Sequence, residues 1–550
     1  MERVIGRHGG VFKRTALISG LTLASRILGF VREVLSAVLF GDRSAIFDAF
    51  LTAWRVPNLF RRFFGEGALS TSLQTALVEE DTERGDAAGR ALFHATLWRT
   101  SWILLGTCIV AAVGLQLLRP YVGLGFLGDE TSALAAIELT VRLLPFVPLI
   151  CLAALTAGAL QVRGHYAAPA LAPVAMNLAW IAVLAVLLLV ARGAEQVDQA
   201  RWLAWGVLAA GSLQLFVQLP ALRRHGLWGR GPDESPTEMG SDTARSGAAS
   251  VLRRAAPLAL GAAVYQINVM IDGLMAKGLL ADGGATAHYF ANRVQQFPLA
   301  LIAVAATAAV FPKLKALAQA GRRHELRELH DRTQAAVAFL ALPASAGLLA
   351  LSPWISAALF QHGNYGSEGV ERLGGALSML SLALLPAGAV GLTSRLYYAL
   401  DDFKHPVRVS IAMLALNTGL NVLFVVGLGM DVEGLALGTA CSSWINLALL
   451  LPGLRGQLGL PPARPGDLGH LPGILVAALV TGALAHVTAR SVAIAVPEDL
   501  GAGLRAALIL VPAMLAGALG LVLAAQALGL PEWRELKGRF ARRRRGPFDA

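Results

Sequence analysis

The sequence predicts an all-α polytopic membrane protein. Of its 550 residues, 55% are hydrophobic and only 15% are charged, whereas about a quarter of the residues of a soluble domain are charged. Apolar runs that reach the ~20 residues needed for one transmembrane helix recur along the whole chain. The polar residues lie mainly in the short segments between these runs. We therefore expect fourteen transmembrane helices.

The expected helices follow one another with short connections. In chain order they cover residues 15–40, 46–77, 94–118, 133–160, 168–191, 201–221, 252–279, 285–311, 333–359, 371–400, 407–428, 432–453, 471–489 and 502–529. Because basic residues precede the first apolar run, this run resembles a signal peptide. Because Arg26 and Arg32 interrupt that run and no cleavage site ends it, we interpret it as an uncleaved span.

Basic residues predict the orientation of these spans. They gather in the segment after residue 222, in the segment after Phe311 and in the tail 531–550, all of which lie on the side of the termini. The opposite loops hold few of them, so the positive-inside rule places both termini in the cytoplasm. The same distribution accounts for the net charge of +11 without a nucleic-acid partner.

The chain divides into two similar halves. The segment 223–251 is rich in Gly, Ser, Pro and Asp, which predicts a flexible linker. The corner 159–177 loosely resembles the corner 399–417, and such internal repeats are typical of transporters. The predicted parts are an N-terminal six-helix lobe (1–222), a cytoplasmic linker (223–251), a second six-helix lobe (252–455), two extra helices (456–530) and a basic cytoplasmic tail (531–550).

The stretch from Ser25 to Ser70 carries many charges for two adjacent spans. A charge at the bilayer centre costs ~3 kcal/mol on insertion scales, so these residues require a polar cavity. Most of them are arginines, and a guanidinium group matches phosphate oxygens, which predicts an anionic substrate. The charged residues are Arg26, Arg32, Glu33, Asp48, Arg55, Arg61, Arg62 and Glu66.

This stretch, SRILGFVRE…FDAFLTAWRVPNLFRRFFGEGALS, resembles the signature of the MurJ/MviN family, the lipid II flippases of bacterial cell-wall synthesis. Further matches occur in order along nearly the full chain, in ALQVRGHYAAPALAPVAMN, ANRVQQFPLALIAVAATAAVFPKL, ALFQHGNYG and SRLYYALDDFKHPVRV. The resemblance implies the fold of the multidrug/oligosaccharidyl-lipid/polysaccharide exporter superfamily. In that fold two six-helix lobes surround a central cavity, and here two C-terminal helices would border a groove for the lipid tail.

The resemblance also implies a function and a location. Such a protein is a transporter and not an enzyme. It carries undecaprenyl-pyrophosphate-linked muropeptide (lipid II) from the cytoplasmic to the outer leaflet of the bacterial inner membrane by alternating access. No ATP-binding Gly-rich loop is present, so we expect the membrane potential, Na⁺ or H⁺ to drive transport, with no other cofactor.

In the first span, Arg26 and Arg32 match family arginines and are candidates to bind the pyrophosphate. At ~100° per residue they lie about 120° apart, so a straight helix would not aim both at one point. A bend at Gly29 would bring them together. The alternative is that one of them extends to the cytoplasmic interface.

The second span holds a helical stripe of charged residues. Its members, at spacings of 7, 7 and 4, are Asp48, Arg55, Arg62 and Glu66. Arg61 lies about 100° off this stripe, yet the family resemblance points to Arg61. Because Pro57 would rotate the stripe, both Arg61 and Arg62 remain candidates to bind substrate, together with Arg55. The acidic residues, with Glu33, either form structural ion pairs or form a gate.

In the eighth span, Arg293 matches the arginine of the family's second lobe, which would approach the substrate across the cleft. Many relatives carry acidic residues beside this arginine, whereas this chain has Asn292 and Gln296. The arginine therefore lacks its usual neighbouring counter-charge, which weakens the case for acid-dependent gating here. We keep Asn292 and Gln296 among the candidate gating residues.

A second group of polar residues suits a hard monovalent cation such as Na⁺. Asp272, Asn417, Asn421 and Thr439 would supply a carboxylate, amide carbonyls and a hydroxyl. The resemblance supports this site, since family members can carry sodium among the same three spans. The alternatives are hydrogen bonds between helices, with Asp272 paired to Lys277, or proton coupling through Asp272.

The remaining polar residues of the spans predict structure more than chemistry. Glu138 and Arg142, at i and i+4, predict a structural ion pair. His165, His288 and His405 lie near span ends, so we interpret them as interfacial residues and not as metal ligands.

Competing functions make different demands on the sequence. The main alternative is export of another polyprenyl-linked glycan, followed by a membrane scaffold without transport. Cationic drugs fit an arginine-rich cavity poorly, and a glycosyltransferase would need catalytic carboxylates in a long outer loop that this chain lacks. We expect a monomer that binds lipid II and membrane lipids, with cell-wall synthesis proteins as further candidate partners.

Overall fold

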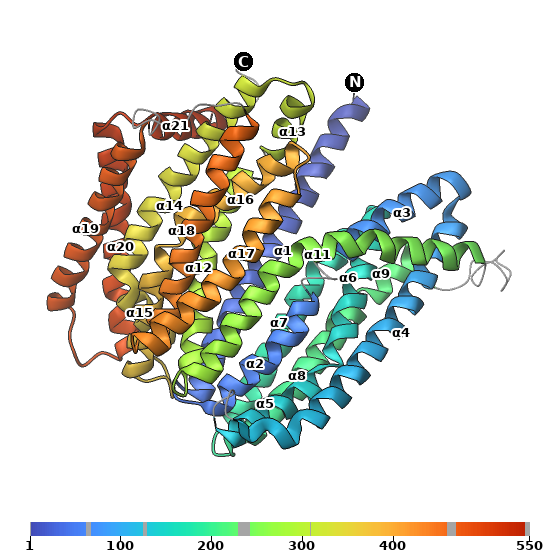
Figure 1. Cartoon of the computed structure of the whole chain (residues 1–550), viewed down its shortest axis with the longest axis horizontal. Helices are drawn as coiled ribbons and strands as arrows, with labels where there is room; N and C mark the ends of the chain where they lie inside the picture. The colour runs from blue at the N-terminus through green and yellow to red at the C-terminus, as the bar shows by residue number, and fades with distance from the viewer. Residues whose placement is uncertain are drawn as a thin grey trace. The chain divides into compact units, whose positions relative to one another are not determined.

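The computed structural model describes residues 2–61, 68–124, 129–228, 242–307, 310–458 and 469–544. These residues form helices joined by short turns (Figure 1). Nine of the described helices are long and apolar enough to cross a membrane, or ten if a pair bent by 44° is counted as one span. The chain is therefore an all-α membrane protein with many spans, as its composition predicts.

Four predicted spans fall outside this set, and each of them includes residues or side chains that the structure does not describe. They are the first, second, seventh and eighth, and they hold the candidate arginines and Asp272.

The chain forms two compact units, Met1–Asp282 and Gly283–Ala550. Helix α11 (Asp242–Leu279) belongs to the first unit, where it packs against helices α2, α3 and α4. It begins within the segment predicted as a linker. Residues 229–241 of that segment lie outside the described residues, and residues 242–251 are helical.

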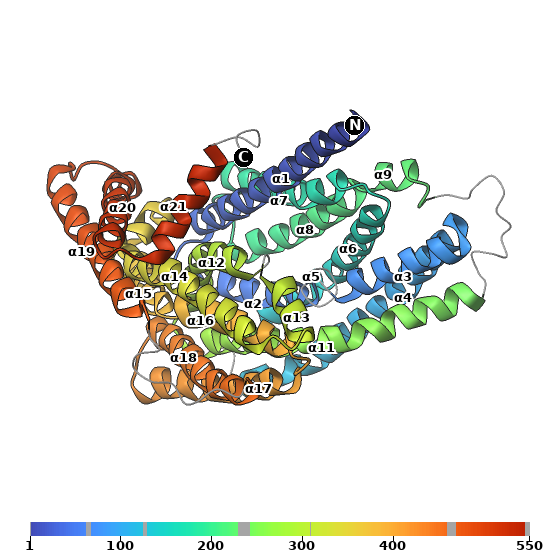
Figure 2. The same cartoon turned by 90° about the horizontal axis from the view of Figure 1, so that it is seen from above.

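The first unit is built around a cluster of aromatic residues. Ser44 caps α2 by accepting a hydrogen bond from the N–H of Phe47 (3.0 Å), and Phe47 stacks on Phe40. Trp54 packs edge-to-face on Trp180, which fixes α2 against α7. Helix α1 lies along α7 (Figure 2). Besides α11, the helices are α1 (Glu2–Phe40), α2 (Ala45–Phe60), α3 (Ala68–Arg84), α4 (Asp86–Leu118), η2 (Arg119–Leu124), α5 (Glu130–Leu143), α6 (Phe146–Val162), α7 (Ala167–Val190), α8 (Gln196–Phe216) and α9 (Leu219–Arg224).

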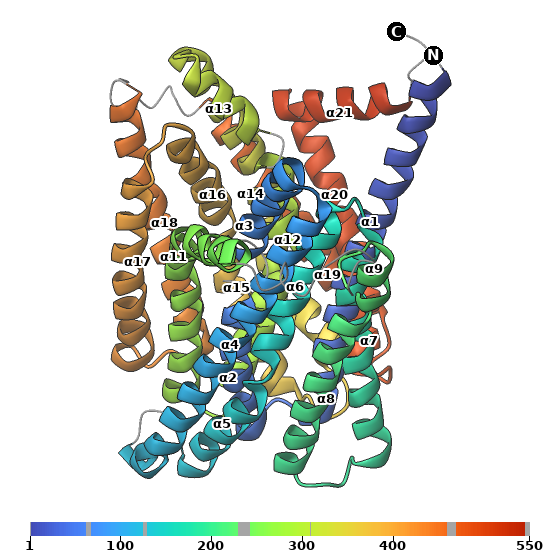
Figure 3. The ribbon, with the colours of Figure 1, turned by 90° about the vertical axis from the view of Figure 1, so that its right-hand side faces the viewer.

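The second unit contains the two extra C-terminal helices. Helices α19 and α20 pack on each other and on α14, and Gly517 brings α20 close to α19. Helix α17 lies beside α18 (Figure 3). The helices are α12 (Gly284–Thr307), α13 (Phe311–Gln319), α14 (Arg323–Phe360), α15 (Ser367–Ser381), α16 (Leu384–Ala399), α17 (Lys404–Val422), η3 (Leu423–Gly427), α18 (Val432–Gln457), α19 (Leu471–Ala495), α20 (Ala502–Ala527) and α21 (Pro531–Arg544).

The two corners that resemble each other in sequence also share a backbone geometry. Each follows a helix pair with a short break, α5–α6 in one unit and α15–α16 in the other. The first corner turns at Gly164 (φ 73°) and the second at Asp401 (φ 62°). In both, the next N–H reaches back five residues, from His165 to the Leu160 carbonyl (2.9 Å) and from Asp402 to the Tyr397 carbonyl (3.0 Å).

Asp402 caps the helix that follows the second corner. Its Oδ1 accepts hydrogen bonds from the N–H groups of Lys404 and His405, both at 3.0 Å. The bond from His405 is the main reason why the pKa of Asp402 lies below its ordinary value. Because the folded-state pKa is depressed, this stabilisation is present above the ordinary carboxyl pKa. It is lost as the pH falls through the folded-state value.

We expect Asp402→Ala to destabilise the protein by about 1 kcal/mol, since two helix N–H groups lose their acceptor. Asp402→Asn retains an oxygen acceptor and should cost less. The measurement is the apparent melting temperature of the purified protein in detergent at neutral pH. Equal melting temperatures for Asp402→Ala and the unaltered protein would show that the cap does not stabilise this corner.

Candidate functional site

Arg32 is a buried cation whose charge is balanced within the first unit. The residue is 6% exposed, and its Nη2 lies 2.7 Å from Oε1 of Glu33. Its Nη1 donates to Oδ1 of Asn177 (3.3 Å), and its guanidinium lies 4.2 Å from the ring centroid of Trp180. A carboxylate, an amide and an aromatic face thus hold one arginine between α1 and α7.

Arg26 lies in a different environment from Arg32. It is exposed, and α1 runs as one helix through Gly29 between the two arginines. Asn177 packs beside Gly29 and donates to the carbonyl of Ser25 (2.9 Å). The amide of Asn177 therefore contacts both turns of α1 that carry the predicted arginines, although one arginine is buried and the other is not.

Arg55 extends from α2 across a glycine of α11. Its Nη1 donates to the carbonyl of Val269 (3.1 Å). A Cβ atom on Gly273 would lie 2.0 Å from Cζ of Arg55, so the guanidinium occupies the space where a side chain would stand. The bond to Val269 aims the charge at the backbone of the helix that also carries Asp272.

The other charged residues of the second span differ in how they are placed. Asp48 is 1% exposed in the first turn of α2. Arg61 directly follows this helix, and its Nε and Nη2 donate to Oδ1 of Asn58 at 3.1 and 3.0 Å. Arg62 and Glu66 lie outside the described residues, so the choice between Arg61 and Arg62 stays open.

In the second unit, Arg293 lies over an aromatic ring of its own helix. Its Cζ is 5.5 Å from the ring centroid of Tyr289. The neighbouring Asn292 donates to the carbonyl of His288 (3.0 Å) and lies 3.2 Å from its Nε2. His288 is buried near the start of α12, and its interpretation as an interfacial residue stays a prediction. Of the two polar residues predicted for gating here, Asn292 contacts His288, and no contact of Gln296 with His288 is described.

Three of the four proposed sodium ligands belong to the second unit. Asn417 and Asn421 are buried, and Nδ2 of Asn421 lies 3.3 Å from Oδ1 of Asn417. Asn417 in turn donates to Oγ of Ser442 on α18 (3.3 Å). The Thr439 hydroxyl donates to the Leu435 carbonyl of its own helix (3.1 Å). The bond to Ser442 is the hydrogen bond between helices that we considered as the alternative.

The fourth ligand, Asp272, belongs to the first unit. Its Oδ2 accepts a hydrogen bond from Nδ2 of Asn268, one turn earlier on α11 (3.1 Å). Nζ of Lys277 lies 3.9 Å from Asp282. The complete ligand set remains a prediction.

The predicted pair of Glu138 and Arg142 is confirmed, with Nη2 of Arg142 at 2.9 Å from Glu138. Arg201 of α8 also binds both oxygens of Glu138, at 2.9 and 3.1 Å. A carboxylate between two arginines fixes α5 to α8, which is a structural role.

The MurJ family model, described as lipid II flippase MurJ, matches residues 36–496. The chain belongs to the MurJ family. A Burkholderia cenocepacia protein named lipid II flippase MurJ is 30% identical over 480 residues, which cover 86% of this chain and 90% of that protein. A Rhizobium tropici protein named probable lipid II flippase MurJ is 30% identical over 451 residues, which cover 81% of each.

Solved structures support the same fold. A structure of lipid II flippase MurJ in an inward closed conformation matches with a TM-score of 0.72 and 21% identity, covering 93% of this chain and 99% of that one. An inward-facing multidrug transporter of the MATE family matches with a TM-score of 0.64 and 14% identity, covering 81% and 98%. The fold of this MurJ family member is thus that of the predicted exporter superfamily.

The sequence did not reveal the residues that hold the arginines in this MurJ family member. Asn177, Trp180 and Gly273 are far from Arg32 and Arg55 along the chain, and each belongs to an ordinary type for a membrane helix. Their proximity depends on the packing of α7 on α1 and of α11 on α2. A signal existed only for Asn177, which is the asparagine that ends the first repeated corner.

We expect Gly273→Ala to displace Arg55 and impair function, because the new methyl group would overlap the guanidinium. Growth of a strain depleted of its own flippase measures function, and membrane abundance measures folding. Gly20→Ala is the matched control. A Cβ atom added to Gly20 would have no atom of a neighbouring helix within 4 Å. Alanine there should be neutral or slightly stabilising. Full rescue by Gly273→Ala would contradict a role for the position of Arg55.

Proposed function

We propose that this protein is a lipid II flippase and not an enzyme. The observation that carries the proposal is that arginines are concentrated in predicted apolar spans of a chain that belongs to the MurJ family. A lipid-linked muropeptide has an anionic pyrophosphate head and a long apolar tail. Moving that head through hydrocarbon without a partner is prohibitive, whereas a hydrated cationic cavity lowers the barrier while the tail stays in lipid.

In this proposal Arg26, Arg32 and Arg293 bind the pyrophosphate during alternating access. Arg55 and one of Arg61 and Arg62 supply further positive charge. The buried contact of Arg32 with Glu33 suggests an exchange, in which the pyrophosphate replaces the carboxylate as the partner of the guanidinium. Such an exchange would make Glu33 a gating residue without any covalent chemistry.

The proposal includes the bacterial inner membrane as the location, with both termini in the cytoplasm. This orientation rests on the basic residues of the termini and of the segment between the two halves. Transport of the head group would then run from the cytoplasmic to the outer leaflet. Export of another polyprenyl-linked glycan would use the same chemistry. The two functions differ in the lipid-linked substrate that the protein binds.

We also propose that Asp272, Asn417, Asn421 and Thr439 bind Na⁺ and couple its gradient to transport. Buried amide and carboxylate oxygens are ligands that suit a hard cation. The hydrogen bond from Asn417 to Ser442 would keep this amide oriented when the cation leaves.

Loss of the arginines should abolish rescue of a strain depleted of its flippase. We expect Arg26→Ala, Arg32→Ala and Arg293→Ala each to fail, because each removes a positive charge proposed to bind the pyrophosphate. Native mass spectrometry should show roughly tenfold weaker retention of lipid II, since a charged hydrogen bond is worth ~1.5–3 kcal/mol. Arg332→Ala is the control, because that exposed side chain pairs with Glu328 on the surface. Rescue by all three arginine variants would refute the arginine cavity.

We expect Asp272→Asn to weaken any sodium dependence of transport, because the site would lose its only full negative charge. The measurement is lipid II translocation in proteoliposomes with and without a Na⁺ gradient. Ser443→Ala serves as the control, since its hydroxyl donates to the Thr439 carbonyl on the same helix. An unchanged sodium response in Asp272→Asn would remove the ion site from the mechanism.

A further inference from the structure

A groove opens on the first unit, away from the arginines assigned to the substrate. Its volume is about 900 Å³, which is within the usual ~300–1,000 Å³ of small-molecule sites. Helices α4, α6, α8, α9 and α11 contribute to it. Most of the lining is apolar, including Trp98, Trp102, Ile103 and Phe216.

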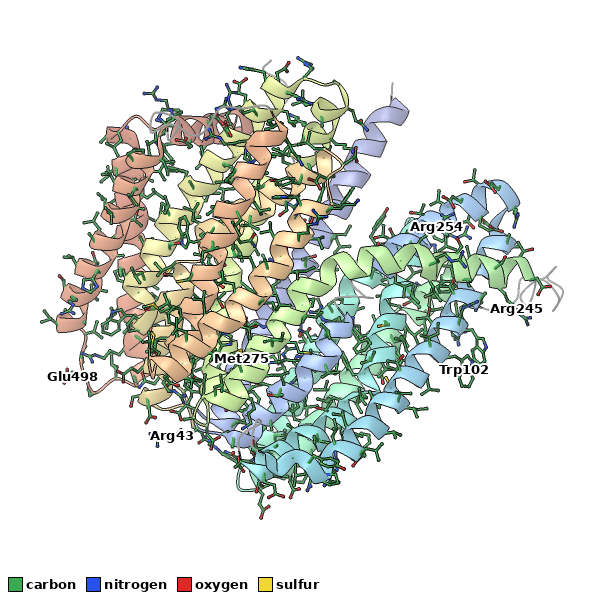
Figure 4. The ribbon with its side chains drawn as sticks, viewed as in Figure 1. Arg43, Trp102, Arg245, Arg254, Met275 and Glu498 are labelled. Carbon is green, nitrogen blue, oxygen red and sulfur yellow. The ribbon has the colours of Figure 1, made fainter. Side chains whose placement is uncertain are left out.

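The groove is lined by large aromatic side chains that are exposed. Trp98 is 67% exposed and Trp102 is 57% exposed, and their rings meet edge to face at 5.5 Å. Figure 4 shows Trp102 projecting outward from α4, on the same edge of the unit as Arg245. Tryptophans with one apolar and one polar side are enriched at the level of the lipid headgroups.

The length of α4 places the groove at that level. The 19 residues from Thr100 to Leu118 complete the helix after Arg99, and at ~1.5 Å per residue they span roughly 28 Å. This distance is close to the ~30 Å thickness of the hydrocarbon core. If the end of α4 marks one boundary of the core, Arg99 marks the other, in the leaflet where α4 begins.

Two arginines stand at the groove. Arg99 of α4 is exposed, and Arg245 of α11 is 70% exposed. Nη1 of Arg245 lies 3.9 Å from Asp242, a fully exposed carboxylate that binds it only weakly in water. The groove therefore joins an apolar wall to two cationic groups, which complements an acyl chain attached to an anionic headgroup.

We propose that this groove is a binding site for an anionic phospholipid of the surrounding membrane. Arg99 and Arg245 bind its phosphate, and one acyl chain lies along Trp98, Trp102 and Phe216. The bound lipid bridges α4 to the first turns of α11. This site is separate from the pyrophosphate site, since none of the arginines assigned to the substrate lines the groove.

The test uses the full-length protein, purified in a mild detergent and examined by native mass spectrometry. Phosphatidylglycerol and phosphatidylethanolamine are titrated separately. We expect the unaltered protein to retain one phosphatidylglycerol molecule more tightly than phosphatidylethanolamine. Arg99→Gln combined with Arg245→Gln should weaken phosphatidylglycerol binding roughly thirtyfold, because each of the two basic residues near a membrane surface contributes ~1 kcal/mol.

Arg254→Gln is the matched control. Arg254 lies on the same helix, is similarly exposed and already pairs with Glu79 at 3.0 Å, outside the groove (Figure 4). It should bind phosphatidylglycerol as the unaltered protein does. A second variant, Ala95→Trp, fills the groove while leaving both arginines in place, and it should also weaken binding.

Three results would overturn the proposal. Equal retention of the two phospholipids would mean that the lipid only surrounds the protein. Unchanged phosphatidylglycerol binding by the double arginine variant or by Ala95→Trp would place the lipid elsewhere. A third contrary result is that equimolar lipid II displaces the phospholipid from the unaltered protein and that the double arginine variant loses this displacement. That result would assign the groove to the substrate instead.

Discussion

A positive charge inside a membrane helix must have a partner, and this constraint shapes the first unit. Arg32 meets it with the carboxylate of Glu33, the amide of Asn177 and the face of Trp180. Two of these partners belong to α7, so Arg32 is stabilised only when α1 packs on α7. Trp180 also contacts Trp54, so the position of the ring that faces Arg32 depends on α2 as well.

Arg55 meets the constraint in another way. It uses a backbone carbonyl on α11 and the space that Gly273 leaves open. A carbonyl supplies only a partial negative charge, whereas Glu33 places a full negative charge beside Arg32. The contacts described for the two arginines thus come from different kinds of group.

The sequence predicted those features that depend on local patterns. Apolar runs predicted the all-α membrane fold, motif resemblance predicted the MurJ family, and the i, i+4 spacing predicted the pair of Glu138 and Arg142. The burial of His288 was not predicted, because a position near a span end says little about burial. The partners of the arginines also escaped prediction, since their contacts cross long sequence separations that only tertiary packing sets.

The adjacency of Arg32 and Glu33 has an electrical consequence. Moving one elementary charge across the membrane field takes ~2.3 kcal/mol per 100 mV. The two side chains lie on neighbouring residues of one helix and are 2.7 Å apart, so any shift of α1 carries them together. Their opposite charges then cancel, and this pair adds nothing to the gating charge of such a movement. Rocking of α1 is electrically silent at this position for as long as the pair stays closed.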